Sequence, residues 1–289
     1  MSTRPFRSAL YIPGSKPRAL EKARSLAVDA ILFDLEDAVA PDEKSAARQT
    51  LTDELEAGGY GDRVRIVRIN GLDTPWGADD AAAVAGMSCD AVLLPKPGGA
   101  EDIDALTKLV PHLPVWAMIE SPAGVLNAQA IAAHPAVQGF VIGTNDLAKD
   151  LGSRNRAALS TALQVALLAA RAAGIVAIDG VYNAFRDDDG LRRECEEGRD
   201  LGYDGKSLIH PSQVAIANEV FAPSEAEIEL ATRQIAAFAE AEANGQGVAV
   251  LDGRIVENLH VATARATLDK AAAIRELEAA AGHDVAAGA

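Results

Sequence analysis

The sequence is poor in cysteine and in aromatic residues. It has two cysteines, Cys89 and Cys195, which are too few for a disulfide framework or for a zinc site built from several thiolates. Aromatic residues make up 4% of the 289 residues, so few rings are available for stacking on nucleic-acid bases. The cysteine count favours a protein of the reducing cytoplasm.

Basic residues are also scarce, and no long apolar run is present. Lys and Arg total 27 against 42 Asp and Glu, which gives a formal charge of −15. A chain this acidic is a poor partner for nucleic acid or for an anionic membrane, although a local basic pocket remains compatible with it. The longest apolar stretch, Thr161–Ile178, is interrupted by Gln164, Arg171 and Gly174, so no membrane-spanning segment is expected.

What the chain does have is a regular alternation of short apolar segments with helical ones. Hydrophobic residues make up 49% and charged residues 24%, as in globular proteins. The apolar segments are short and continuous, which is typical of parallel strands that are buried on both faces. Eight strands are expected, each followed by a helix: Ala9–Ile12, Ala30–Phe33, Val64–Asn70, Ala91–Leu94, Val115–Ile119, Gly139–Ile142, Ile175–Ile178 and Gly205–Ile209.

Eight such units within residues 1–221 predict an α/β fold of the (β/α)₈ TIM barrel type. An open doubly wound sheet is the alternative, but no glycine-rich dinucleotide loop follows the first strand. From residue 222 to residue 289 the pattern changes. A helix over Ser224–Asn244, a hairpin over Val248–Val256 and a helix over Leu259–Ala280 form an extension too small for a core of its own. It is expected to pack on its own barrel or on a neighbouring subunit.

Polar residues stand where the predicted strands end, which is where barrel enzymes place their catalytic groups. Converging carboxylates repel one another unless a cation lies among them, and oxygen ligands without His or Cys suit Mg²⁺. Glu120 and Asp146 end consecutive strands and could share one metal ion, or each could cap the helix that follows it. The full set is Asp34, Glu36, Asp37, Arg68, Asn70, Lys96, Glu120, Asn145, Asp146, Asp179, Lys206 and His210.

Arg68 is the clearest indication of an anionic substrate, because a guanidinium can bind a carboxylate through two hydrogen bonds. The alternative is an ion pair with one of the neighbouring acids. Residues 34–37, which include three acids, could be functional or could be a solvated loop with helix-capping acids. His210, which precedes a proline, is more consistent with a buried, hydrogen-bonded histidine than with a catalytic one.

Seven strings along the chain together resemble the citrate lyase beta-subunit-like family, which includes malyl-CoA and citramalyl-CoA lyases. They occur in family order over essentially the whole chain, and any one alone would be a weak signal. The strings are RSALYIPGS at 7–15, DLEDAV at 34–39 with Lys44 and Arg48, VRIN at 67–70, PK at 95–96, IESPAG at 119–124, GTNDL at 143–147 and GYDGKSLIHP at 202–211.

The resemblance implies a Mg²⁺-dependent carbon–carbon lyase that cleaves a 3-hydroxyacyl-CoA thioester, or forms it in reverse. It assigns Glu120 and Asp146 to the metal and Arg68 to the substrate carboxylate, with Lys96 and Glu120 also at the substrate. Asp34, Glu36 and Asp37 would order water, metal and neighbouring side chains. The family's C-terminal lid carries a catalytic Asp in a Gly-Lys-Met-x-Asp-like string, whereas this chain has GRIVE at 253–257 and so places Glu257 there.

The resemblance also implies a homo-oligomer, a trimer or hexamer, with a lid that can reach an adjacent subunit. The first hypothesis is thus a lyase acting on a malyl-CoA-like or citramalyl-CoA-like thioester. The second is the citryl-thioester lyase subunit of a citrate lyase complex, whose substrate is bound to a carrier protein. The third, a non-catalytic structural barrel, is disfavoured by the intact set Arg68, Glu120 and Asp146.

Overall fold

The computed structural model describes residues 4–287, with side chains up to residue 280. Eight parallel strands close into a barrel in chain order, and β8 pairs with β1, where Ser8 lies opposite Lys206. This pairing excludes the open sheet and confirms the (β/α)₈ barrel. The strands are β1 Ser8–Pro13, β2 Ala30–Asp34, β3 Val64–Arg68, β4 Ala91–Pro95, β5 Val115–Ile119, β6 Val137–Ile142, β7 Val176–Asp179 and β8 Gly205–Leu208.

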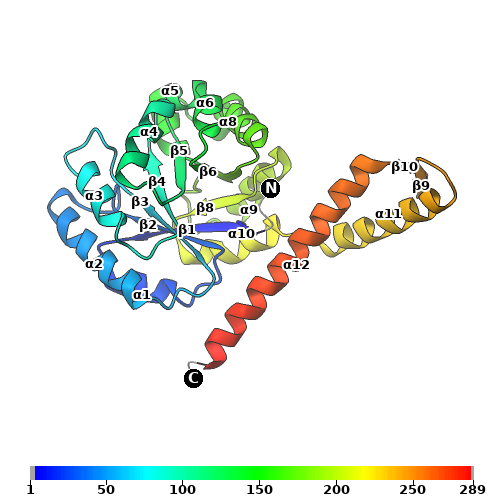
Figure 1. Ribbon diagram of the computed structural model, residues 1–289, viewed down its shortest axis with the longest axis horizontal. Helices are drawn as coiled ribbons and strands as arrows, with labels where there is room; N and C mark the ends of the chain where they lie inside the picture. Colours follow the sequence, from blue (N-terminus) through cyan, green and yellow to red (C-terminus); the bar gives the residue numbers. More distant parts are fainter. Residues whose placement is uncertain (1–3, 288–289) are drawn as a thin grey trace. The chain divides into compact units, whose positions relative to one another are not determined.

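Helices cover the outside of the barrel (Figure 1). The helical segment that follows β5 is divided in two at Asn127, whose ψ of 8° is not helical and whose side chain donates to the Gly98 carbonyl at 2.6 Å. No helix among residues 4–287 is long and apolar enough to cross a membrane. The barrel helices are α1 Pro17–Ala23, α2 Lys44–Ala57, α3 Gly77–Val84, α4 Ala100–Leu109, α5 Pro122–Leu126, α6 Ala128–Ala132, α7 Thr144–Leu151, α8 Ser160–Ala173, α9 Asp188–Leu201 and α10 Val214–Phe221.

Alternation along each strand separates the barrel interior from the layer under the helices. In β2, Ala30 and Leu32 belong to an inner cluster made almost wholly of strand residues, whereas Ile31 and Phe33 pack in the larger cluster with the helices. Since successive side chains point to opposite faces, the last residue of β2, Asp34, faces inward at the carboxyl end of the barrel. The same alternation turns the polar ends of β3 and β5 toward the mouth.

Two residues expected at the mouth lie instead on the outside of the barrel. Ile178 belongs to the inner cluster, so Asp179, the next residue of β7, points outward. There it binds the Lys206 ammonium at 2.8 Å and the Arg156 guanidinium at 2.9 Å, and Lys206 also lies 2.7 Å from Glu194 of α9. The expectation that Asp179 and Lys206 belong to the mouth is therefore wrong.

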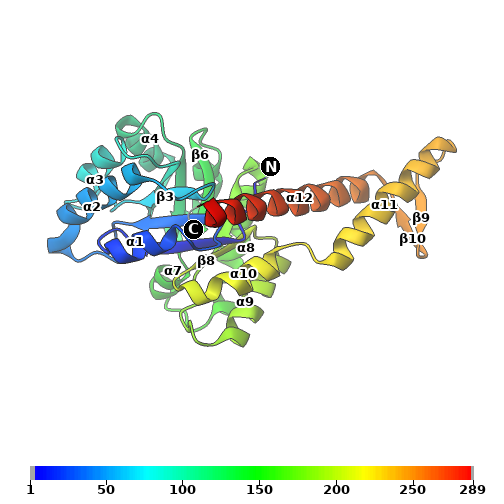
Figure 2. The same cartoon turned by 90° about the horizontal axis from the view of Figure 1, so that it is seen from below.

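The chain divides into two compact units, Phe6–Phe221 and a second that contains Arg4, Pro5 and the chain from Ala222 onward. The second unit has the predicted helix, hairpin and helix: α11 Glu225–Ala243, β9 Ala249–Leu251, β10 Arg254–Val256 and α12 Asn258–Ala287. The hairpin turn uses Asp252 and Gly253, both with positive φ, and the hairpin lies beside α11 (Figure 2).

The second unit has a small apolar cluster. Five buried side chains from α11, the hairpin and α12 form it: Phe238, Ala241, Ala249, Val256 and Val261. Most other apolar side chains near the hairpin are exposed, and Val250 and Ile255 are the clearest examples, with 70% and 63% of their surfaces accessible.

Candidate active site

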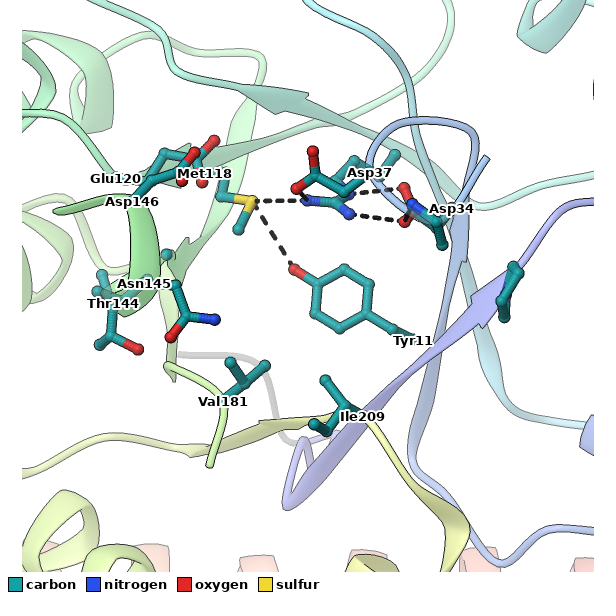
Figure 3. Close-up of a pocket in the computed structure, with 15 residues that line it drawn as sticks. Tyr11, Asp34, Asp37, Met118, Glu120, Thr144, Asn145, Asp146, Val181 and Ile209 are labelled. Atoms are coloured by element: carbon teal, nitrogen blue, oxygen red, sulfur yellow. Dashed lines mark hydrogen bonds and ion pairs between the residues drawn. The ribbon is translucent and has the colours of Figure 1, made fainter. Parts of the chain in front are cut away.

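A pocket of about 350 Å³ opens at the carboxyl ends of the strands, and Figure 3 shows the side chains that line it. Its walls come from the ends of β1, β2, β3, β5 and β6 and from the segments that follow β2, β5, β6, β7 and β8. The lining residues are Tyr11, Pro13, Asp34, Asp37, Ala38, Arg68, Met118, Glu120, Ile142, Gly143, Thr144, Asn145, Asp146, Val181 and Ile209. Six residues predicted from the strand ends are among them: Asp34, Asp37, Arg68, Glu120, Asn145 and Asp146.

Asp34 and Arg68 form a buried two-point ion pair at one side of the pocket. Arg68 Nε donates to Asp34 Oδ1 at 2.7 Å and Nη2 donates to Oδ2 at 2.6 Å. The same carboxylate accepts the backbone N–H groups of Glu36 at 2.8 Å and Ala38 at 3.0 Å. Asp34 therefore fixes both the guanidinium and the acidic loop after β2.

Arg68 also contacts the other two acids of this loop. Its Nη1 lies 2.7 Å from Glu36 Oε2 and 3.4 Å from Asp37 Oδ2. Glu36 is only partly exposed, at 12%, and this partial burial raises its pKa to about 7, although the Arg68 charge acts to lower it. Asp37 is mostly solvent-exposed. Each guanidinium nitrogen of Arg68 thus has an acidic neighbour. This arrangement matches the alternative in which Arg68 forms ion pairs with nearby acids.

Glu120 follows β5 and is almost completely buried. Burial raises its pKa to about 8, and the nearby Glu36 carboxylate acts in the same direction. Its Oε1 accepts the Lys96 backbone N–H at 3.2 Å. A Cβ at position 143 would overlap the Glu120 side chain. Gly143 therefore leaves the space that the Glu120 carboxylate fills. The capping alternative for Glu120 is not seen, because Ser121 Oγ accepts the Gly124 N–H at 3.0 Å and caps α5 instead.

Asp146 lies in the first turn of α7, one turn beyond the expected strand end. No side-chain cap hydrogen bond is present at the start of α7, and the Asp146 carboxylate instead lies 2.7 Å from the Lys96 ammonium. Lys96 has a φ of +51°, a left-handed conformation that is uncommon for a non-glycine residue. Its ammonium also lies 3.7 Å from Glu36. Partial burial acts to lower the pKa of Lys96, but Asp146 and the other acids raise it overall.

The donor set at this side of the pocket fits a magnesium ion. Glu120 and Asp146 provide carboxylate oxygens from adjacent positions on the barrel, and no thiolate or imidazole stands with them. Burial raises the pKa of Glu120, so a cation beside it would favour the charged carboxylate that a metal needs. Among the described residues, no three His, Cys, Asp or Glu side chains gather into a metal-holding cluster.

Several pocket residues were not predicted from the sequence. The Tyr11 hydroxyl donates to Met118 Sδ at 3.7 Å, and the Arg68 guanidinium lies 4.9 Å from the centre of the Tyr11 ring. Burial raises the pKa of Tyr11 well above its usual value. Strand alternation could have predicted Tyr11 and Met118, because each lies two residues after an inward-facing residue of its own strand. Thr144, on the first turn of α7, had no such signal.

Two other residues considered from the sequence, His210 and Glu257, are not among the residues that line the pocket. His210 is hydrogen-bonded, since Nδ1 lies 2.8 Å from Ser212 Oγ, but it is exposed rather than buried and its ring packs against Phe185. Glu257 belongs to the second unit, where it is exposed just before α12 and its backbone N–H donates to His260 Nδ1 at 3.2 Å. Its role as a lid acid stays a prediction.

Known proteins resemble this chain over nearly all of its length. A Cereibacter sphaeroides protein named (3S)-malyl-CoA thioesterase is 65% identical over 273 residues, which cover 93% of this chain and 96% of the relative. A protein of the same species named L-malyl-CoA/beta-methylmalyl-CoA lyase is 37% identical, with 88% of this chain and 91% of the relative covered.

A solved structure extends the similarity to three dimensions. The CitE protein of Mycobacterium tuberculosis, in complex with magnesium, acetoacetate and coenzyme A, superimposes with a TM-score of 0.80 at 29% identity, and the match covers 94% of this chain and 100% of that one. The family model described as HpcH/HpaI aldolase/citrate lyase matches residues 7–211, which contain every barrel strand. The chain belongs to the HpcH/HpaI aldolase/citrate lyase family.

Proposed function

We propose that the protein hydrolyses the thioester of a malyl-CoA-type substrate, releasing malate and coenzyme A. The observation that carries this proposal is the 65% identity, over 93% of the chain, to a relative named as a malyl-CoA thioesterase. The relative named as a lyase is much less similar, at 37%. Hydrolysis consumes one water, breaks the carbon–sulfur bond and leaves the carbon skeleton of the acyl group whole.

The pocket supplies groups suited to this reaction. Glu120 and Asp146 would hold a magnesium ion, which when bound would polarise an oxygen of the substrate. Glu36, with a pKa of about 7, is suited to accept a proton from water near neutral pH as the water oxygen attacks the thioester carbon. The electron pair of the carbon–sulfur bond leaves with sulfur, and the released thiolate then takes up a proton.

The basic groups organise the acids around that water. Arg68, paired with Asp34, fixes the loop that carries Glu36 and Asp37. The half-exposed Lys96 ammonium lies between Glu36 and Asp146, where it can offset the negative charge of a bound acyl group. Asp34 and Arg68 are positioning residues in this scheme, and a substrate carboxylate that displaces Asp37 would add a direct contact to Arg68.

Carbon–carbon bond cleavage is the second candidate, and the same acids favour it. A retro-Claisen reaction on malyl-CoA gives acetyl-CoA and glyoxylate, and it needs a group that delivers a proton to the departing enolate. The family's lid Asp would supply that proton, whereas this chain has Glu257, one methylene longer, at that place. Hydrolysis forms no enolate, so it makes no demand on the lid acid.

Product analysis separates the two reactions. The purified protein, with Mg²⁺ and malyl-CoA, is expected to release one free thiol and one malate for each thioester consumed, and ¹⁸O from labelled water should enter the malate carboxylate. A lyase would instead give acetyl-CoA and glyoxylate with no free thiol. An Asp146→Asn protein serves as the control for contaminating thioesterases. Acetyl-CoA as the sole coenzyme A product would refute hydrolysis.

The partners follow from the same proposal. The substrate carries coenzyme A, and the expected homo-oligomer stays a prediction that light scattering coupled to gel filtration would test. A carrier-protein substrate, as in a citrate lyase complex, would require partner chains that co-purify with the protein. Turnover of free malyl-CoA by the isolated chain would argue against that requirement.

A further inference from the structure

One hydroxyl in the wall of the pocket has no partner. Thr144 is the first residue of α7, is 8% exposed and lines the pocket, where Figure 3 labels it beside Asn145. None of the described residues makes a hydrogen bond with its hydroxyl. Although the residue is 92% buried, its hydroxyl oxygen keeps access to the pocket, so this unpaired donor is placed to meet a ligand there.

The backbone opposite Thr144 leaves room for this side chain. Gly180 follows β7, and a Cβ there would lie 2.5 Å from both Oγ1 and Cγ2 of Thr144 and 2.9 Å from the Ile142 carbonyl oxygen. Any larger residue at position 180 would push the threonine or the backbone away. The glycine thus provides the space that lets Thr144 keep its present position.

The polar neighbours of Thr144 are already engaged with one another. The amides of Asn145 and Asn183 donate to each other at 3.3 Å and 2.7 Å, and Asp146 is paired with Lys96. The first N–H groups of the eight-residue helix α7 have no acceptor within the helix, and they favour negative charge near Thr144. The free hydroxyl and these N–H groups suit the same ligand, an oxygen atom with negative charge.

We infer that the Thr144 hydroxyl donates a hydrogen bond to an oxygen of a short bound carboxylate, namely the acyl part of the thioester or the acid it releases. The ligand class is a small 2-hydroxy or 2-oxo carboxylate. This inference rests on the proposed function for the substrate. It makes Thr144 a binding residue that recognises the acyl group, in addition to the acids and Arg68.

Substitutions that separate the hydroxyl from the methyl group test the inference. Thr144→Val keeps the shape and removes the hydroxyl, whereas Thr144→Ser keeps the hydroxyl and removes the methyl. Thr161→Val, an exposed position in α8, is the matched control. Binding of malate, glyoxylate and acetoacetate to the Mg²⁺-loaded proteins is measured by calorimetry, and malyl-CoA kinetics are measured alongside.

The valine variant should bind the best of these carboxylates about tenfold more weakly and should raise KM more than it lowers kcat, since one hydrogen bond is lost. The serine and control variants should stay within about threefold of wild type. Equal affinity of the valine variant and wild type, an equal loss in the serine variant, or no binding of any carboxylate by wild type would each overturn the inference. Carboxylate binding without thioester hydrolysis would refute only the proposed function.

Discussion

Two clusters of acids and bases stand on opposite sides of the barrel wall. At the mouth, Arg68 and Lys96 lie among five acids, Asp34, Glu36, Asp37, Glu120 and Asp146. Under the helices, Lys206 and Arg156 bind Asp179 and Glu194. Lys206 and Asp179 are 0% exposed, whereas Asp37 and Lys96 at the mouth are 70% and 49% exposed. Residues of the same types are thus open to solvent at the mouth, whereas in the cluster under the helices, called here the outer cluster, they are buried and tightly paired.

The difference shows that pairing, and not composition, separates a candidate site from a structural network. In the outer cluster the buried cations closely match the buried acids, and Lys206 touches two carboxylates within 2.8 Å. At the mouth, burial raises the pKa of Glu36 and of Glu120, and neighbouring acids act in the same direction against the charges of Arg68 and Lys96. Carboxyl groups with raised pKa values are typical of functional sites.

The largest expected effect comes from removing a carboxylate at the mouth. Glu120→Gln or Asp146→Asn should lower Mg²⁺-dependent turnover about 10³-fold, because a metal that is no longer held cannot stabilise charge on the substrate. The circular dichroism spectrum and melting temperature should stay near wild type. Near-normal turnover in either variant would remove that residue from the metal site.

The outer cluster should respond in the opposite way. Lys206→Met leaves Asp179 and Glu194 without their shared ammonium and is expected to lower the free energy of unfolding by about 3–5 kcal/mol. Turnover per folded molecule should be nearly unchanged. Urea unfolding of this variant beside Lys108→Met, an exposed control, checks the difference. A loss of activity without a loss of stability would place Lys206 in the active site after all.

Strand alternation explains which parts of this contrast could be read from the sequence. Eight apolar segments and their spacing were enough for the barrel, and alternation from the inward-facing Leu32 places Asp34 inward too. The same rule applied to Asp179 would have placed it outside, because it follows the inward-facing Ile178. Thr144 could not be found this way, since its burial depends on Gly180, 36 residues further along the chain and on another strand end.

Arg68 is expected to show an intermediate effect. Arg68→Lys keeps the charge but loses the two-point pair with Asp34, so kcat/KM should fall by about 30- to 1,000-fold, equivalent to about 2–4 kcal/mol. The division of this loss is informative. A lower melting temperature would indicate that Arg68 acts mainly through its ion pair with Asp34. A higher KM at unchanged stability would indicate that Arg68 contacts a carboxylate of the substrate. A loss below threefold with no change in stability would contradict both roles.

Magnesium affinity should depend on pH with a definite sign. Burial raises the pKa of Glu120 to about 8, so below that pH the metal-free carboxyl holds a proton that Mg²⁺ must displace. The apparent affinity should therefore rise up to about tenfold for each pH unit between about pH 6 and 8 and level off above. Calorimetry in buffers of different ionisation enthalpy should detect the released proton near pH 7. An affinity that stays constant from pH 6 to 9 would contradict the raised pKa.

Glu257 is expected to show the smallest effect, and it decides between the two reactions. If the protein hydrolyses its thioester, no enolate needs a proton, and Glu257→Gln should change malate release by less than about twofold. If it is a lyase with Glu257 as the lid acid, the same substitution should lower acetyl-CoA formation about 10²-fold or more. In both cases Mg²⁺ affinity should be unchanged, because the proposed ligands are on the barrel. A 10²-fold loss of malate release with intact metal binding would show that the second unit acts in hydrolysis too, and the comparison of mouth and outer cluster would then have to include the hairpin.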